Sequence, residues 1–113
     1  MTVREIYDET ESLLGLNDYG DGLSSIDVFQ KDFFICINRV LLDLTDTDFK
    51  IKSLRDTIDL KPSYKSVISY GTAMWLALIL GDAAKQNILA NAYNPLRTRH
   101  KSEFSSITDT LPR

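Results

Sequence analysis

The stretch that decides the fold is residues 26–44, which read IDVFQKDFFICINRVLLDL. Large apolar side chains recur here every three or four residues, as they do on one face of an α-helix. This face consists of Ile26, Phe29, Phe33, Ile37, Val40, Leu41 and Leu44. Because Phe34 and Cys36 widen the stripe, we expect the helix to be buried on two sides, against other helices or at a subunit interface.

A short helix is predicted before this stretch, over residues 3–14. Thr2 and Glu5 have the spacing of a capping box, in which the threonine hydroxyl accepts a hydrogen bond from the backbone amide three residues later. Gly15 is expected to end the helix, because glycine readily takes the left-handed conformation that follows many helices. Residues 16–25 are rich in Gly, Asp and Ser, and they are predicted to form a loop.

Two more helices are predicted in the second half of the chain. One covers residues 62–80 and starts at a proline, which suits the first turn of a helix. The other begins at Ala83 and continues to about residue 104. Pro95 removes a backbone donor from it, but the apolar stripe keeps its phase, so we predict one kinked helix. The stripe consists of Ala84, Ile88, Ala92, Leu96, His100 and Phe104.

A long connection, residues 45–61, joins the second and third predicted helices. Phe49, Ile51 and Ser53 alternate with lysines, which indicates an extended segment. Connections of this length are uncommon in small domains and are often functional. We consider two interpretations: a plain crossover between helix pairs, and an arm whose residues Phe49, Ile51 and Leu54 dock on a neighbouring subunit.

These patterns predict an all-α fold, a small bundle of about four helices with a long extended connection and a loose C-terminal tail. We expect one domain over residues 1–104 and a tail over 105–113. The connection and the tail are predicted to contact other subunits rather than the chain's own core. The expected core residues are Phe33, Ile37, Leu41, Val67, Trp75 and Leu78.

No arrangement of residues points to catalysis. The single cysteine, Cys36, lies in an apolar run and is expected to be a small buried side chain. The single histidine, His100, has cationic neighbours and is expected at the surface. The sequence has neither a Gly-rich phosphate loop nor Cys and His pairs at zinc-binding spacing. We therefore expect no enzyme, no metal site and no cofactor.

The net charge of −3 hides an uneven distribution. Residues 1–60 hold 13 acidic and 6 basic side chains, whereas residues 61–113 hold 3 acidic and 7 basic ones. This asymmetry has two interpretations: two solvated faces, and a head-to-tail contact between an acidic part of one subunit and a basic part of the next. The most apolar stretch, residues 73–80, is too short to span a bilayer, so we expect a soluble protein without membrane contact.

Three basic residues, Arg97, Arg99 and Lys101, form a cluster near the C-terminal end of the last helix. Such a run can neutralise phosphates, but the chain as a whole is acidic and no aromatic side chains interleave the cluster for base stacking. Cations near the C-terminal end of a helix also interact favourably with its dipole. We retain the cluster as a candidate contact with a neighbouring subunit or with DNA.

The order of several short motifs extends over most of the chain. The N-terminal residues 2–10 read TVREIYDET, and Leu54-x-Asp56-Thr57-Ile58-Asp59-Leu60 follows later. Next come Tyr70-Gly71-Thr72-Ala73 in the third predicted helix and Ala92-Tyr93-Asn94 in the fourth. This order resembles that of the small head-to-tail connector, or neck, proteins of tailed bacteriophages. Pro95 and the basic run after it have no counterpart in the family pattern.

The resemblance implies a helical protein that forms a homo-oligomeric ring, typically twelve-fold, under the portal protein. Such a ring extends the DNA channel, where it can contact packaged DNA non-specifically, and presents a docking surface for the next neck or tail protein. It also implies a location in the virion neck, after assembly in the host cytoplasm. Two alternatives stay open: a small helical adaptor or regulatory protein that binds a cellular protein, and a weak DNA-binding factor.

Overall fold

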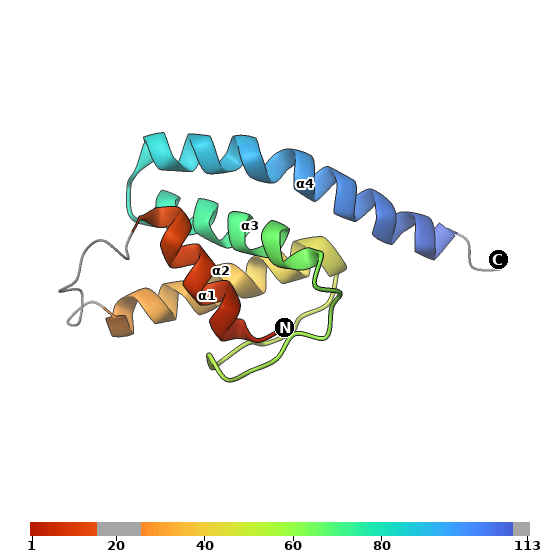
Figure 1. The fold of residues 1–113 in the computed structure, drawn as a ribbon, viewed down its shortest axis with the longest axis horizontal. Coiled ribbons are helices and arrows are strands. Elements are labelled where there is room, and N and C mark those ends of the chain that lie inside the picture. Colours follow the sequence, from red (N-terminus) through yellow and green to blue (C-terminus); the bar gives the residue numbers. More distant parts are fainter. Residues whose placement is uncertain (16–25, 110–113) are drawn as a thin grey trace.

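The computed structural model is an all-α bundle (Figure 1). It describes residues 1–15 and 26–109, without the side chains of residues 26–29 and 103–109. The helices in this part of the chain are α1 (Val3–Leu14), α2 (Ile26–Thr45), α3 (Tyr64–Ile79) and α4 (Ala83–Asp109). These residues form no β-strand, so the predicted all-α class is confirmed. The loop predicted over 16–25 lies outside the described residues.

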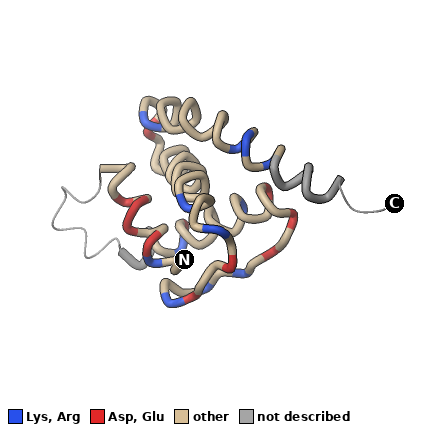
Figure 2. The backbone as a smooth tube through the Cα atoms, turned by 45° about the vertical axis from the view of Figure 1, so that its right-hand side comes forward, with Lys and Arg blue, Asp and Glu red and all other residues tan. Residues whose placement is uncertain are grey.

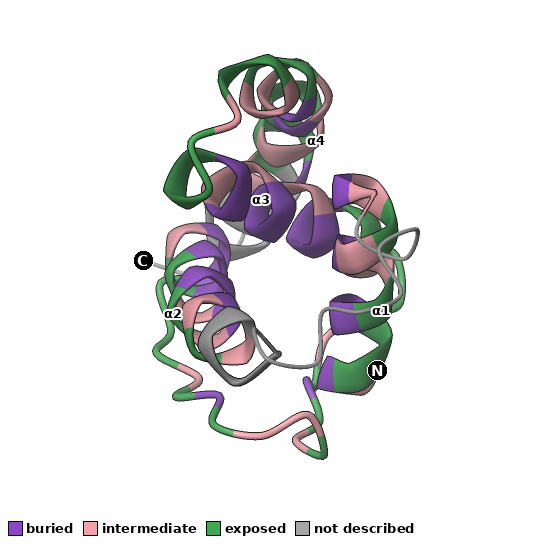
Figure 3. Ribbon diagram, turned by 90° about the vertical axis from the view of Figure 1, so that its left-hand side faces the viewer, coloured by how far each residue is buried: buried purple, intermediate pink, exposed green. Residues whose placement is uncertain are grey.

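The central helix of the bundle is α3, which packs against α1, α2 and α4. An end-on view shows α1 and α2 on opposite sides of α3 (Figure 3). Figure 1 shows that α2 and α3 run in opposite directions and that α4 extends beyond the other helices at its C-terminal end. The bundle therefore has two separate lateral faces, one on α1 and one on α2 and α4.

The core lies between α1, α2 and α3, and most of its predicted members are confirmed. Phe33, Ile37, Leu41 and Val67 have no exposed surface. Trp75 is only half-buried, and Leu78 is 55% exposed, so the prediction of these two as buried is wrong. The reason is that α3 is apolar on nearly every side, and it turns its small alanines and Leu76 toward its neighbours instead. Helical periodicity alone cannot select the buried face of such a helix.

The helix ends follow the local chemistry of the sequence. The Glu5 amide donates to Thr2 Oγ1 at 3.3 Å, and Gly15 has the left-handed φ of 73° after α1. At the other end of the chain, the Lys85 amide donates to Asp82 Oδ1 at 3.0 Å and so caps α4. These caps confirm the predicted starts of α1 and α4 and the end of α1.

The connection between α2 and α3 passes beneath the N-terminal end of α1 (Figure 1). The amides of Val3 and Arg4, which have no partner inside their helix, donate to the carbonyls of Asp56 at 2.9 Å and Leu54 at 3.1 Å. The Ile58 amide donates to the Met1 carbonyl at 2.8 Å. The connection therefore supplies the backbone acceptors that the first turn of α1 requires.

Side-chain contacts also hold this connection against the bundle. Asn38 of α2 accepts from the Ile51 amide at 2.7 Å and donates to the Ile51 carbonyl at 3.0 Å. Ile51 and Ile58 are buried in the core, and Phe49 and Leu54 pack against it half-buried. The prediction that this segment avoids the chain's own core is therefore wrong. Alternation correctly indicated an extended backbone, but it carries no information about which surface that backbone packs against.

The fourth helix is continuous through Pro95, and its axis bends in Figure 1, as predicted. It ends at Asp109, so residues 105–109, predicted to belong to the tail, are helical; residues 110–113 lie outside the described part. Its buried large side chains are Leu89, Tyr93 and His100, of which only His100 belongs to the predicted stripe. Ile88 of that stripe is 66% exposed, so the predicted face is wrong at this end of the helix.

Candidate interaction surfaces

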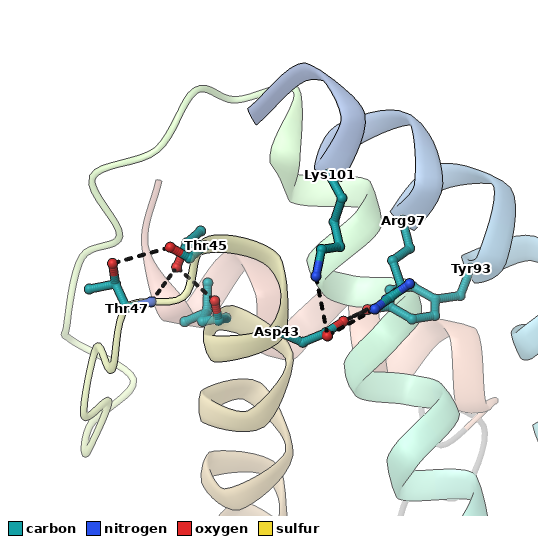
Figure 4. Close-up of polar contacts among 7 residues, drawn as sticks. Asp43, Thr45, Thr47, Tyr93, Arg97 and Lys101 are labelled. Carbon is teal, nitrogen blue, oxygen red and sulfur yellow. Dashed lines mark hydrogen bonds and ion pairs between the residues drawn. The ribbon is translucent and has the colours of Figure 1, made fainter. Parts of the chain in front are cut away.

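The predicted basic cluster lies against an acidic side chain of the same chain (Figure 4). Arg97 of α4 donates to both carboxylate oxygens of Asp43 in α2, through Nε at 2.6 Å and Nη2 at 3.0 Å. Lys101 Nζ lies 3.7 Å from Asp43 Oδ1, and the Tyr93 hydroxyl donates to Oδ2 at 3.5 Å. Two of the three predicted contact residues therefore connect α4 to α2, while Arg99, which lies between them in the sequence, is exposed.

This cluster shifts the proton affinities of its members. The hydrogen bonds from Arg97 lower the pKa of Asp43, and the positive charges of Arg97 and Lys101 act in the same direction. Burial raises the pKa of Tyr93 to about 12, with a further contribution from the Asp43 charge. The carboxylate is therefore ionised and the phenol protonated at neutral pH, as a structural ion pair requires.

The single cysteine and the single histidine, two residue types that can act in catalysis, are both buried. Cys36 is 2% exposed, as predicted, and burial raises the pKa of its thiol to about 12, which keeps it in the unreactive thiol form. His100 is 7% exposed, so its predicted surface position is wrong. Its ring lies 4.6 Å from that of Tyr64 in α3, because its position in the helical repeat follows Leu89 and Tyr93.

An open groove of about 490 Å³ lies beside the Asp43 cluster, between α2, α3 and α4. The Arg39 guanidinium lies 4.8 Å from the centre of the Trp75 ring, in a cation–π contact. Trp75 and Met74 are half-buried, whereas Arg39 is exposed. The remaining lining residues are Asp43, Tyr93, Asn94 and Arg97. Trp, Tyr, Met and Arg are the residue types enriched in the centres of protein interfaces.

A second surface, the apolar end, lies where α3 passes into α4. Large aliphatic side chains there are about half exposed or more. They are Leu78, Ile79, Leu80 and Ile88. Figure 3 shows the helix ends on this side of the bundle exposed. Single exposed apolar residues are common, but a group at one end of a small bundle indicates a protein-binding surface.

The sequence identified some of these features and missed others. Of the proposed docking-arm residues, Ile51 is buried in the core, and only Phe49 and Leu54 keep partial exposure. Asp43 and Asn38, which fix the positions of α4 and of the connection, had no signal in the sequence, because each pairs with residues that only the fold brings near. The exposed residues of the apolar end were also missed, since the local pattern assigned Leu78 to the core.

The described residues contain no group of three or more His, Cys, Asp or Glu side chains positioned to hold a metal ion. Within the same part of the chain, none of the helices combines the length and the hydropathy needed to cross a membrane. Comparison of the chain with known protein families, curated proteins and solved structures finds no match.

Proposed function

We propose that this protein is a non-enzymatic structural subunit of the neck of a tailed bacteriophage. It forms a ring that docks under the portal protein, joins head to tail around the DNA channel, and binds the next neck or tail component. Its place of action is the virion neck, and it assembles in the host cytoplasm. The resemblance of the motif order to connector proteins supports this assignment, together with the all-α fold that the resemblance implies.

The observation that carries the proposal is the apolar end at the junction of α3 and α4. Fully burying one large aliphatic side chain stabilises a complex by about 1.5–3 kcal/mol, whereas an exposed ion pair contributes about 0–1 kcal/mol. Contact through Leu78, Leu80 and Ile88 therefore provides most of the affinity for a protein partner. Because this surface lies at the end of the bundle, it faces the adjacent layer, the portal, when the bundles stand side by side in a ring.

A helical adaptor for a cellular protein would use the same apolar end, and it remains the second candidate. A DNA-binding function has less support, because Arg97 and Lys101 already lie at the Asp43 carboxylate. Genes for portal, capsid and tail proteins beside this gene would favour the neck assignment over both alternatives.

The direct test mixes the purified chain with the portal protein encoded in the same genome and measures complex mass by size-exclusion chromatography with light scattering. We expect a complex larger than the portal alone, with ring-like stoichiometry. The double variant Leu80→Glu/Ile88→Glu should remove binding, because it places charges on the apolar end. Lys61→Glu, an exposed substitution near the opposite end of α3, is the matched control and should bind normally.

The binding measurement also separates the candidates. If the chain and the portal elute independently at all concentrations, the neck assignment is wrong. If the chain binds the portal but the apolar-end variant binds equally well, the docking surface lies elsewhere on the molecule.

A further inference from the structure

We propose that copies of this chain associate head to tail, with the acidic face of α1 in one copy seated in the groove between α2, α3 and α4 of the next. This inference rests on the proposed function in one respect, since a ring needs a repeated contact between its subunits. It adds the two surfaces and their residues, which are distinct from the apolar end that is assigned to the portal.

The groove offers a cation without an ion-pair partner in the described part of the chain. Arg39 lies over the Trp75 ring and forms no ion pair there. Among the lining residues and Lys101, three cationic side chains, Arg39, Arg97 and Lys101, accompany one carboxylate, that of Asp43. An arginine that stacks on an aromatic ring keeps its donors in a fixed plane, which suits recognition of a carboxylate. The excess of positive charge in the groove therefore favours binding of an acidic partner.

The complementary surface is the outer face of α1. The helix carries four acidic residues and one basic residue, and one of the acids, Glu9, lies 3.8 Å from Lys65 of α3. Glu5 and Asp8 are exposed on this face, and Arg4 lies 3.6 Å from Asp8. Burial and then the neighbouring Asp8 charge raise the pKa of Glu11 on the same helix. Like charges thus repel one another on α1, and a cationic partner would relieve that repulsion. Figure 2 shows the acidic residues on α1 and the basic ones along α4.

The positions of these two surfaces allow the contact to repeat. In the end-on view, α1 and α2 lie on opposite sides of α3, and both show exposed outer faces (Figure 3). One copy can therefore use its α1 face and its groove at the same time. Two different patches on opposite sides produce a heterologous contact, which closes into a ring or continues as a filament.

Charge complementarity identifies a second copy as the occupant of the groove. The contact depends mainly on exposed charges, so it is weak between free chains. Its main effect is to set how two neighbouring copies are aligned, and it contributes little to their affinity. Docking of several copies on one portal raises their effective concentration, and this drives the ring to completion. Because the contact is weak, the free chain stays dissociated at low concentration. The same contact completes the ring once several copies are held on one portal.

Two variants test the contact, each removing one surface. Arg39→Glu reverses the groove charge, and Glu5→Lys/Asp8→Lys reverses the α1 face. Sedimentation measurements at chain concentrations up to about 1 mM should show wild-type association, corresponding to at least about −4 kcal/mol. Raising the salt from about 0.1 M to about 1 M should weaken it, since the Debye length falls from about 10 Å to about 3 Å. Each variant alone should associate at least about tenfold more weakly.

Mixing the two variants gives the sharpest result. The intact α1 face of the Arg39→Glu chain meets the intact groove of the Glu5→Lys/Asp8→Lys chain, and the reversed face of the second chain is complementary to the reversed groove of the first. The mixture should therefore associate more strongly than either variant alone. Lys61→Glu, with the same change in charge as Arg39→Glu, should associate like the wild type. Circular dichroism checks that each variant is folded, and the neutral pair Glu5→Gln/Asp8→Asn replaces the reversed one if that variant unfolds.

The proposal is overturned if the wild type stays monomeric up to the highest concentration, if either variant associates normally, or if the mixture associates no more strongly than either variant alone. Portal binding is measured separately on the same proteins. Loss of portal binding with intact head-to-tail association would contradict the proposed function alone, whereas portal binding without association would contradict only this inference.

Discussion

Gly71 in α3 is packed so closely that a methyl group added at this position would overlap its neighbours. A Cβ atom there would lie 2.7 Å from Cε1 of the Tyr93 ring and 3.1 Å from Cγ1 of Val40. The group that approaches α3 most closely at this position is the ring of Tyr93. That ring is buried and its hydroxyl contacts Asp43, so it has little freedom to move.

We predict that Gly71→Ala destabilises the protein, although alanine favours a helix by about 1 kcal/mol over glycine. Overpacking a core costs about 1–3 kcal/mol, so the net loss in the free energy of unfolding should be up to about 2 kcal/mol. Urea denaturation measures this loss. In a Tyr93→Leu background the same substitution should cost less, and an equal or larger cost there would show that the ring is not the obstacle.

Asp43 makes the stability of the bundle depend on pH. Its pKa is lowered from the ordinary 3.8, mainly by the Arg97 hydrogen bonds, so its ion pair stabilises the fold at neutral pH. That contribution is present above the unfolded-state pKa and is lost as the pH falls through the folded-state pKa. Both side chains of the pair are 38% exposed, which limits the contribution to about 1 kcal/mol.

We therefore expect Asp43→Asn to lower stability by up to about 1 kcal/mol at pH 7 and by progressively less as the pH is lowered toward 2. Thermal unfolding across this pH range measures the difference between variant and wild type. Asp59→Asn removes an exposed carboxylate and serves as the control. A difference for Asp43→Asn that is the same at both pH values would contradict the role of the ion pair.

At the scale of elements, the connection between α2 and α3 illustrates what the sequence can and cannot predict. Helix bounds and caps depend on neighbouring residues, so the sequence predicted α1 and the start of α4 correctly. The hydrogen bonds between Asn38 and Ile51 and from Arg97 to Asp43 join residues 13 and 54 positions apart. Nothing local marks such partners. For this reason the sequence left open whether the connection is a crossover or an arm, and it made the basic run a candidate contact with a neighbouring subunit or DNA.

The structure predicts that the connection resists proteolysis in the isolated chain, because the core and Asn38 hold it. Asn38→Ala leaves the Ile51 amide and carbonyl without their side-chain partner and should cost about 1–3 kcal/mol. Limited proteolysis with mass spectrometry should then show faster cleavage within residues 46–63 than in the wild type. Asn87→Ala, on an exposed part of α4, should change neither the free energy of unfolding nor the rate of cleavage in this segment. Rapid wild-type cleavage in this segment would contradict the packing described above.

At the scale of the whole molecule, α2 contributes fully buried side chains to the core, whereas α3 has buried side chains on one side and exposed ones on the other. Phe33→Ala should lower the free energy of unfolding by about 3–5 kcal/mol, because the ring has no exposed surface and packs edge-on against Tyr7. Leu78→Ala should cost less than about 0.5 kcal/mol, because that side chain is exposed. Chemical denaturation of both variants checks the assignment, and a loss at Leu78 as large as that at Phe33 would contradict it.

In the proposed assembly, each surface of the bundle has a different role. The α1 face and the groove lie on opposite sides and would serve contacts between copies, and the apolar end would face the adjacent layer of the neck. The stripe of residues 26–44 was sufficient to predict the class of fold. It was not sufficient to predict the surfaces, because these depend on which side of the apolar helix α3 remains uncovered.

Cryo-electron microscopy of the chain mixed with its portal protein is the measurement that tests the neck assignment most directly. The account predicts one additional ring beneath the portal, with one copy of the chain for each portal subunit. In that ring, the α3–α4 ends face the portal and α1 of each copy lies in the groove of the next. A portal ring with no added density, at chain concentrations well above those used for binding, would contradict the account.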